Sequence, residues 1–383
     1  MWRFIASRLL QTIVTFLLFL TLIFFLLEAQ PGDFSAVLFG DSRLTAAQLQ
    51  TIRAQMGINR TPVEQYLHWM SGFLRGDFGV SLSEYPRPVL DILAERAPRT
   101  AVLFLTATVL SFSLGFWAGK LLAWRRGSRL EIAATVGGVA LYTVFTPWFA
   151  LWMLWLFAFL LRIFPVGKFI TYEIWDAGAP SANTVFLQIL LCGLVFPLFL
   201  WGFLRVTRRL SSTTLRPVRM IGLLVVAAAV AAYWVLTGQA VYALDILYHL
   251  ALPVLTLTLI SFGGTMLLTR SSMLAVLRED YITTARAKGL TESEVRDRHA
   301  ARNALLPVVT TFVFAMAFAV DGGVVTESIF SWEGMGYTLI HAVEQSDIPL
   351  AVGALVLTGA LVLIAHLVAD VLYLMLDPRL RRP

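Results

Sequence analysis

The amino-acid sequence predicts an all-α integral membrane protein, a polytopic helical bundle in which the chain crosses the bilayer several times. Of its 383 residues, 58% are hydrophobic and only 14% are charged, which suits a membrane protein and not a soluble domain. The hydrophobic residues gather in runs of about 20, the length that a membrane-spanning helix needs. The basic residues stand at the ends of these runs, so the net charge of +6 marks helix ends and does not indicate nucleic-acid binding.

Eight apolar runs are candidates for membrane-spanning helices, and they lie at residues 9–27, 101–123, 132–160, 184–204, 220–236, 249–269, 306–325 and 350–374. The first run follows Arg3 and Arg8, which raises the alternative of a signal peptide. It is longer than the apolar core of a signal peptide, roughly 7–15 residues, and no small-x-small cleavage site follows it. We therefore expect a retained helix. In the third run, Pro147 predicts a kink, because proline removes a hydrogen bond from the helix.

The basic residues predict which ends of the spans face the cytoplasm, since short cytoplasmic segments are enriched in lysine and arginine. With both termini inside, the cytoplasmic segments hold 21 of the 30 basic residues. Apart from the long excursion 29–100, to which the rule does not apply, the outer segments hold only Arg162 and Lys168. The sequence therefore predicts a multi-pass protein of the cytoplasmic membrane, surrounded by lipid, with cytoplasmic N- and C-termini.

The chain divides into four predicted parts. Residues 1–28 form the first transmembrane helix, 29–100 an extracytoplasmic helical region, 101–376 a transmembrane domain and 377–383 a cytoplasmic tail. Three short helices are expected in the second part, at 45–57, 62–74 and 88–95. The second of them begins at Pro62, which suits the first turn of a helix.

A polar segment, residues 281–307, separates two of the spans on the predicted cytoplasmic side. Residues 281–288 predict a short helix that ends at Gly289, since glycine accepts the left-handed conformation common at helix ends. Thr291 and Glu294 have the spacing of a capping box, so a second helix is expected to start at once and to end before Pro307.

Small side chains in this segment, at Ala285, Ala287 and Gly289, would let the surface of a soluble partner approach the backbone closely. The alternative interpretation is an ordinary solvated loop whose charges only mark the cytoplasmic side. The residues alone leave both interpretations open.

The polar segment resembles the coupling loop of ABC importer permeases, in the form found in the oligopeptide and dipeptide permease family. The matching residues are Asp280, Tyr281, Thr284, Ala285, Arg286, Ala287, Lys288, Gly289, Leu290, Arg298, His299, Ala300, Arg302, Asn303, Ala304 and Pro307. The general pattern of such loops has a glutamate where this chain has Thr283, and a shorter gap from glycine to proline. Both departures are normal for the peptide-permease branch. The resemblance implies an ATPase-coupling role for Tyr281, Thr284, Ala285, Ala287, Lys288, Gly289, Leu290, Arg298, His299 and Asn303.

Other segments resemble the same family, at residues 31–33, 56–60, 65–67, 74–79 with Ser81, 327–336 and 377–379. The resemblance implies a six-span permease core whose coupling loop occupies residues 271–305. The usual peptide permease lacks the pair of spans at 184–237, so this chain has an extra pair and about eight spans in total. We expect the extra pair to lie at the periphery.

The resemblance implies the membrane-spanning subunit of an ATP-driven importer that translocates di- or oligopeptides by alternating access. In such importers a second homologous permease completes the pore, two ABC ATPase subunits dock on the coupling loops, and an extracytoplasmic substrate-binding protein delivers the cargo. ATP and magnesium are bound by the ATPase subunits, so this chain is not expected to be an enzyme. Nickel, glutathione or another small solute is the alternative cargo. A secondary transporter, which would usually show midplane carboxylates and an internal repeat, is the alternative mechanism.

The residues predict no catalytic, cofactor or metal site in this chain. The glycine-containing stretch 115–120 is one residue too short for a phosphate-binding loop and is followed by Leu121 in place of serine or threonine. The single cysteine, Cys192, lies inside an apolar run, and the five histidines are scattered. Neither a metal-ligand spacing nor a nucleophile with its base is present in the pattern.

Polar residues inside the spans are candidates for the transport pathway. Four hydroxyl residues spaced by three, four and four share one helix face, and they are Thr258, Ser261, Thr265 and Thr269. They could line a polar pathway or hydrogen-bond between packed helices. Asp321 is a further pathway candidate, because a charge inside the bilayer needs a partner or water. His366 and Asp370 are four residues apart and can pair on one helix face.

Overall fold

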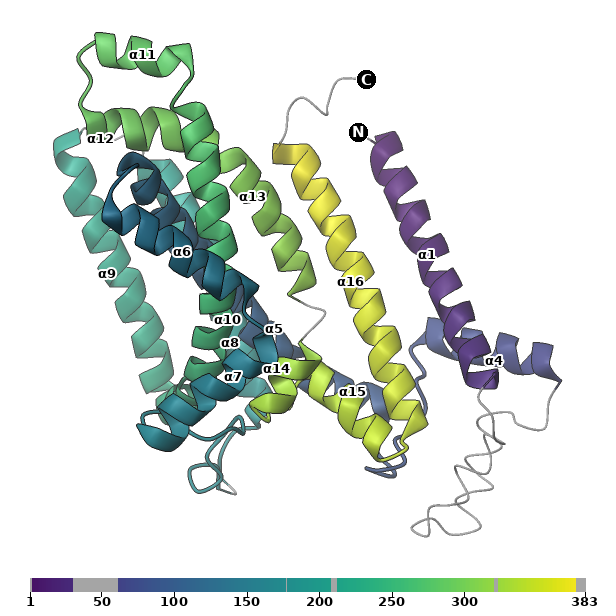
Figure 1. Cartoon of the computed structure of the whole chain (residues 1–383). Helices are drawn as coiled ribbons and strands as arrows, with labels where there is room; N and C mark the ends of the chain where they lie inside the picture. The colour runs from purple at the N-terminus through teal and green to yellow at the C-terminus, as the bar shows by residue number, and fades with distance from the viewer. Residues whose placement is uncertain (1, 30–60, 177, 208–211, 320–322, 377–383) are drawn as a thin grey trace. The chain divides into compact units, whose positions relative to one another are not determined.

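The computed structural model describes residues 2–29, 61–176, 178–207, 212–319 and 323–376 (Figure 1). Within this part of the chain the regular elements are helices, and the only β-type pairing is an isolated bridge between Val80 and Pro88. The all-α prediction is confirmed. The helix expected at 45–57 lies outside the described residues, as do the family-like segments 31–33, 56–60 and 377–379.

The chain forms two compact units. Unit 1 comprises Met1–Ala97, Ser271–Val324 and Gly334–Pro383, and unit 2 comprises Pro98–Arg270 and Val325–Glu333. The helices inside unit 1 are α1 (Trp2–Glu28), α4 (Pro62–Arg75), α11 (Asp280–Ala287), α12 (Glu292–Glu294), the π-helix η3 (Val295–Ala300), α13 (Ala301–Phe318), α15 (Met335–Glu344) and α16 (Ile348–Leu376).

Most helices of unit 2 are long and apolar enough to cross a membrane, either alone or as a bent pair. The helices inside it are α6 (Arg129–Thr143), α7 (Thr146–Met153), the π-helix η1 (Leu154–Leu160), α8 (Ala182–Val206) and α9 (Ser212–Leu236). Three further helices contribute residues to both units, and they are α5 (Val89–Trp124), α10 (Ala240–Val276) and α14 (Val324–Ile329).

Among the described residues, six helices are long and apolar enough to cross a membrane: Ile5–Glu28, Val89–Trp124, Ala182–Val206, Val218–Leu236, Ala240–Val276 and Ile348–Leu372. The pair Arg129–Thr143 and Thr146–Leu160 raises the number to seven if it counts as one span. The helix at the predicted span 306–325 is α13, which has 18 residues and is not in this set. The protein is thus polytopic, and the count of about eight stays a prediction.

The third predicted span is broken and not merely kinked at Pro147. Helix α6 ends at Thr143, α7 begins at Thr146, and the two are bent by 105°. Pro147 stands in the first turn of α7, where a backbone N–H has no helical partner, so proline costs nothing there.

Two helix ends predicted from the sequence, one at residue 95 and one before Pro307, are absent from the structure. The helix predicted at 88–95 and the span 101–123 form one helix, α5, which contains Pro98. The second helix of the polar segment continues through Pro307 to the end of α13. Both predicted ends were wrong. Neither Pro98 nor Pro307 ends its helix, because one proline removes only one hydrogen bond from a long helix and neighbouring groups in a membrane bundle make up that loss.

Unit 1 is centred on α16, which packs against α1, α13 and α15 (Figure 1). Side chains from three helices meet in one buried cluster, and they include Leu20 and Ile23 of α1, Met70 of α4, and Val352 and Val356 of α16. Near the other end of α1, Arg8 forms an ion pair with Asp370 at 3.3 Å. Asp370 is therefore paired with Arg8 on another helix, whereas the Nδ1 of His366, its predicted partner, lies 2.9 Å from the Val362 carbonyl oxygen.

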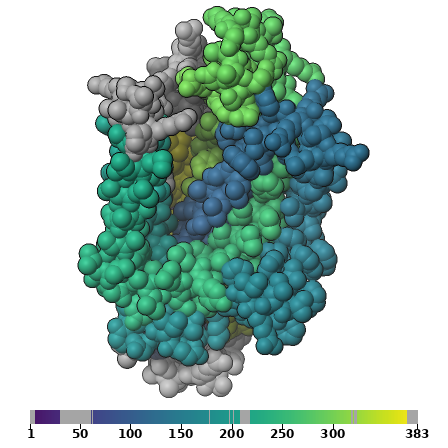
Figure 2. Space-filling view, turned by 90° about the vertical axis from the view of Figure 1, so that its left-hand side faces the viewer, coloured from purple at the N-terminus to yellow at the C-terminus, as the bar shows by residue number. Residues whose placement is uncertain are grey.

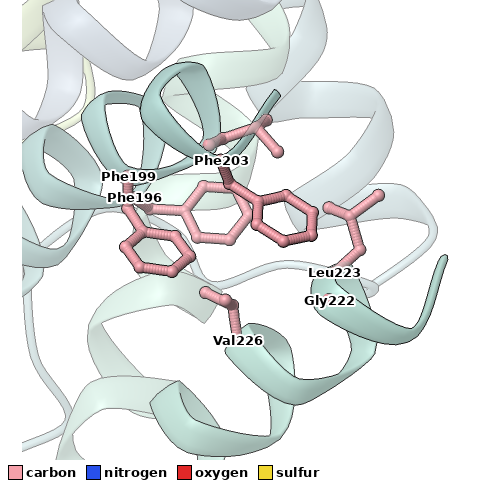
Figure 3. Close-up of a pocket in the computed structure, with 7 residues that line it drawn as sticks. Phe196, Phe199, Phe203, Gly222, Leu223 and Val226 are labelled. Atoms are coloured by element: carbon pink, nitrogen blue, oxygen red, sulfur yellow. The ribbon is translucent and has the colours of Figure 1, made fainter. Parts of the chain in front are cut away.

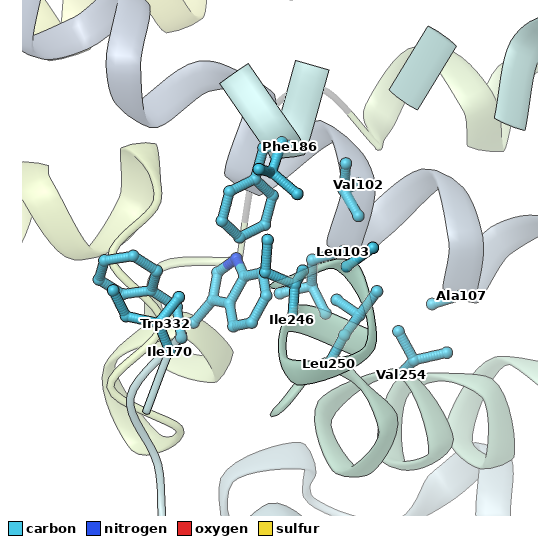
Figure 4. Close-up of a cluster of buried hydrophobic side chains, with 12 residues drawn as sticks. Val102, Leu103, Ala107, Ile170, Phe186, Ile246, Leu250, Val254 and Trp332 are labelled. Carbon is cyan, nitrogen blue, oxygen red and sulfur yellow. The ribbon is translucent and has the colours of Figure 1, made fainter. Parts of the chain in front are cut away.

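Unit 2 has a core around Trp332, which is fully buried (Figure 4). Its ring meets Phe186 edge to face at 5.6 Å, and its Nε1 donates a hydrogen bond to the Arg99 carbonyl oxygen at 3.1 Å. The Arg99 guanidinium, only 2% exposed, lies 4.1 Å from the centre of the Phe169 ring and bonds to the Glu333 carboxylate at 3.2 Å. Trp332 and Glu333 are thereby fixed by contacts with the buried Arg99.

Asp347 links the start of α16 to the segment that precedes α5. Its buried carboxylate accepts hydrogen bonds from the Ser81 hydroxyl, from the backbone N–H groups of Leu82 and Ser83 at 2.9 Å each, and from the Ser83 hydroxyl at 2.7 Å. Its second oxygen accepts from the Leu350 N–H at 3.1 Å and so caps the helix.

Asp347→Ala is expected to destabilise the protein by about 3 kcal/mol, because two backbone donors and a helix start lose their acceptor together. Asp91→Ala is the matched control, since Asp91 stands in the first turn of α5 but is exposed. Its loss should cost at most about 1 kcal/mol. Thermal unfolding of both variants in the same detergent measures the difference, and equal shifts would contradict the assigned role of Asp347.

Candidate functional site

The polar segment folds as two short helices joined by a tight turn, and residues 280–303 are called the two-helix segment below. Helix α11 ends where the sequence predicted. The Gly289 N–H donates to the Arg286 carbonyl at 2.9 Å, and the Leu290 N–H donates to the Ala285 carbonyl at 3.4 Å. This bond pattern requires a left-handed residue, and Gly289 has φ 78°.

The second helix begins with the capping box that was predicted. The Glu294 N–H donates to the Thr291 hydroxyl oxygen at 3.3 Å, and the Thr291 N–H donates to the Glu294 carboxylate at 3.2 Å. The hydrogen bond from the Thr291 hydroxyl, aided by the one from its backbone, lowers the pKa of Glu294. The carboxylate therefore stays ionised at neutral pH and the box stays closed.

The two helices pack through an apolar inner face. Ile282 and Ala285 of α11 and Val295 and Ala300 of η3 are buried. Beyond this face, the Asn303 Nδ2 donates a hydrogen bond to the Tyr281 hydroxyl oxygen at 2.7 Å. Since Asn303 lies in the first turn of α13, this bond ties the start of α11 to the continuing helix.

The outer face of the two-helix segment is exposed and polar (Figure 2, bright green). The exposed residues implied by the family resemblance are Tyr281, Thr284, Ala287, Lys288, Gly289, Arg298 and Asn303, with Leu290 and His299 partly buried. Ala285 is instead buried against η3. It therefore does not offer the close approach to a partner that its size predicted, and Ala287 and Gly289 remain the small residues on the surface.

Charges on this segment are largely paired within it. Arg286 meets Glu292 at 3.2 Å, and Arg298 meets Glu294 at 3.4 Å. Such pairs fix the side chains only weakly, because exposed ion pairs contribute about 0–1 kcal/mol. The backbone shape of the segment is set by the turn at Gly289 and by the capping box. Among the described residues no group of three or more histidine, cysteine, aspartate or glutamate side chains could hold a metal ion.

The hydroxyl residues proposed for a pathway do not share one environment. Thr265 and Thr269 are buried against α5, where a side-chain carbon on Gly115 or Gly119 would come within 2.7 Å or 2.6 Å of the threonine Cβ. Thr269 also donates to the Thr265 carbonyl at 2.8 Å. These two residues pack helices together.

The remaining pathway candidates differ from these two. Ser261 is exposed, and Thr258 is buried with a hydroxyl that has no hydrogen-bond partner among the described residues. Asp321 lies outside the described residues. A pathway role for all these residues stays a prediction.

An ion pair that sequence reasoning missed joins the start of α6 to the end of the unit 2 part of α10. The Arg270 Nε donates to the Glu131 carboxylate at 2.7 Å, and Glu131 also accepts from the Gly127 N–H at 3.3 Å. The helix start was visible in the sequence, since Ser128 caps α6 three residues before Glu131. The partner was not visible, because it lies 139 residues further along the chain.

Comparison with known proteins gives matches over nearly the whole chain. The family described as "Binding-protein-dependent transport system inner membrane component" matches residues 111–382. The family described as "Binding-prot-dependent transport system membrane comp, N-term" matches residues 1–104.

Curated relatives align from end to end. A putative peptide permease protein of Brucella suis is 32% identical over 100% of this chain and 99% of its own length. The oligopeptide transport system permease protein AppB of Bacillus subtilis is 29% identical over 99% of both chains. The dipeptide transport system permease protein DppB of Escherichia coli is 30% identical over 100% of this chain and 99% of its own. On this agreement the chain belongs to the family of binding-protein-dependent transport system inner membrane components, which are permease subunits of ABC importers and serve transport, not catalysis.

Proposed function

We propose that this chain is the permease subunit of an ATP-driven importer of di- or oligopeptides, and that residues 281–290 are its contact with an ATPase subunit. The observation that carries the coupling role is the two-helix segment, whose outer face is exposed while its turn is held by Gly289 and the capping box. A surface that transmits movement must keep its shape. Here the hydrogen bonds at the end of α11 and the capping box at the start of α12 hold the backbone of the turn between them.

The proposed complex contains a second homologous permease, two ABC ATPase subunits and an extracytoplasmic substrate-binding protein. ATP and magnesium bind to the ATPase subunits, and closure of that pair moves the two-helix segments. The permease pair then turns its pathway outward to receive cargo. The proposed orientation has both termini of this chain in the cytoplasm, which puts the two-helix segment on the ATPase side.

Peptide cargo is supported by the names of three full-length relatives, each called a peptide, oligopeptide or dipeptide permease. Nickel, glutathione or another small solute is the alternative cargo within the same mechanism.

The test is a pull-down of the tagged chain from its native membrane in mild detergent, followed by reconstitution of the recovered complex into vesicles. A second permease and ATPase chains should be recovered, and uptake of a labelled dipeptide should require internal ATP. Competition with nickel or glutathione then distinguishes the cargoes. Uptake that persists without ATP and collapses with a proton ionophore would replace the importer with a secondary transporter.

Gly289→Pro is expected to abolish ATPase association and uptake while leaving membrane insertion intact. Proline fixes φ near about −65° and so cannot occupy the left-handed turn, where Gly289 has φ 78°. The matched control is Gly238→Pro, because Gly238 has φ 68° in the turn between α9 and α10, outside the two-helix segment. The control should keep ATPase association in the same pull-down. Wild-type association in the Gly289 variant, at equal membrane levels, would contradict the docking role.

Tyr281 and Asn303, which share one hydrogen bond, are expected to act as one unit in transport. Tyr281→Phe and Asn303→Ala each remove the same hydrogen bond, of about 1 kcal/mol, and should lower initial uptake about twofold to fivefold. The double variant should be no worse than either single variant, since both changes remove one shared interaction. Uptake rates at matched expression measure this, and losses that multiply would show that the two side chains act separately.

A further inference from the structure

The connection between α8 and α9 carries the strongest one-sided charge in the chain. Residues 177–244 contain no aspartate or glutamate, and their five basic residues are all arginines, located between 205 and 219. Both adjoining helices are apolar enough to span a membrane. None of the residues in the most apolar stretch of α9 is buried within the structure, so the side chains of this stretch are accessible from outside the protein.

An apolar groove runs between these two helices next to the arginine-rich end (Figure 3). Phe196, Phe199 and Phe203 of α8 face Gly222 and Val226 of α9 across it. The groove is shallow, and the space enclosed within it is about 10 Å³. Phe199, on one wall of the groove, is 53% exposed, so the groove is open to the surroundings at that residue.

Gly222 shapes the groove by leaving room for an aromatic ring. A side-chain carbon at this position would lie 2.2 Å from the Phe203 Cζ, so the Phe203 ring would have to move to make room for any larger residue. The Phe199 and Phe203 rings are stacked at 6.3 Å with an angle of 8°, which gives one wall a flat apolar surface.

Arg219 stands one helical turn before Gly222, at the rim of the groove. Its guanidinium donates to the Thr207 hydroxyl at 3.3 Å and to the Leu204 carbonyl at 3.4 Å. Both acceptors are neutral, and no acidic residue is present in the neighbouring sequence. The Arg219 guanidinium is therefore held at the end of α8, and no carboxylate between residues 177 and 244 neutralises its charge.

We propose that the groove holds an acyl chain of an anionic phospholipid, with the lipid phosphate at Arg219. The distance along α9 from Arg219 to Val226 is about 10 Å, which lies within one half of a bilayer whose hydrocarbon core is about 30 Å thick. A basic site beside an apolar path between membrane helices matches the two ends of such a lipid. The site lies between α8 and α9 and gives these two helices a role separate from peptide translocation.

The charge and the groove together select this occupant. A free phosphate ion would satisfy Arg219 but would leave the groove unfilled. A zwitterionic phospholipid would fill the groove but would bring no net charge to the arginines. An apolar helix of another subunit would cover the groove without using Arg219.

The test offers the purified full chain, with its bound subunits, equal amounts of phosphatidylglycerol and phosphatidylcholine that have identical acyl chains. Native mass spectrometry counts the lipids that stay bound. Phosphatidylglycerol should be retained in preference to phosphatidylcholine, and millimolar inorganic phosphate should not displace it. Arg219→Gln should lower its retention about fivefold, the effect expected of one arginine near a lipid headgroup, while Arg219→Lys should keep most of it.

Two further variants separate the parts of the site. Val226→Trp fills the groove without changing the charge and should also release the lipid. Arg126→Gln removes the same charge from an exposed loop of unit 2, away from the groove, and should change nothing. Equal retention of both lipids, or equal loss in the Arg126 variant, overturns the proposal. So does crosslinking of Leu223→Cys, on a Cys192→Ser background, to a second membrane chain, because the groove would then be a protein interface.

Discussion

The absence of water from the bilayer interior constrains this structure more than any single contact. A backbone N–H or carbonyl group that loses its helical partner there cannot turn to solvent, so the chain keeps its helices unbroken wherever it can. Helix α5 continues through Pro98 and α10 through Pro253, and each accepts the loss of one hydrogen bond. Where the path does change direction sharply, between α6 and α7, a proline occupies the first turn, in which its missing donor is not needed.

The same constraint explains how polar side chains are used inside the two units. The buried carboxylate of Asp347 is surrounded by donors, the Arg270 guanidinium lies on Glu131, and the Arg99 side chain bonds to Glu333 while it covers an aromatic ring. Each contact joins segments more than a hundred residues apart. Because unpaired charge is so costly in a low-dielectric interior, these contacts fix which segments are neighbours within a unit.

Predictions from sequence succeeded where the interaction was local. The turn at Gly289 and the capping box of Thr291 and Glu294 involve residues at most a few positions apart, and both were readable as spacing. The burial of Ala285 was not readable, because it depends on how α11 packs against η3. The environments of Thr258 and Ser261 differ for the same reason, since helical spacing places residues on a face but does not say what that face meets.

Helices α12, η3 and α13 follow one another without a gap from Glu292 to Phe318. At about 1.5 Å per residue such a continuous helix is roughly 40 Å long. Bending of a helix concentrates where its hydrogen-bond ladder is interrupted, and Pro307 interrupts it opposite the carbonyl of Asn303. The residue that holds Tyr281 is therefore also the one whose carbonyl oxygen loses its helical donor, so the contact between α11 and α13 lies at the point where this long helix bends most easily.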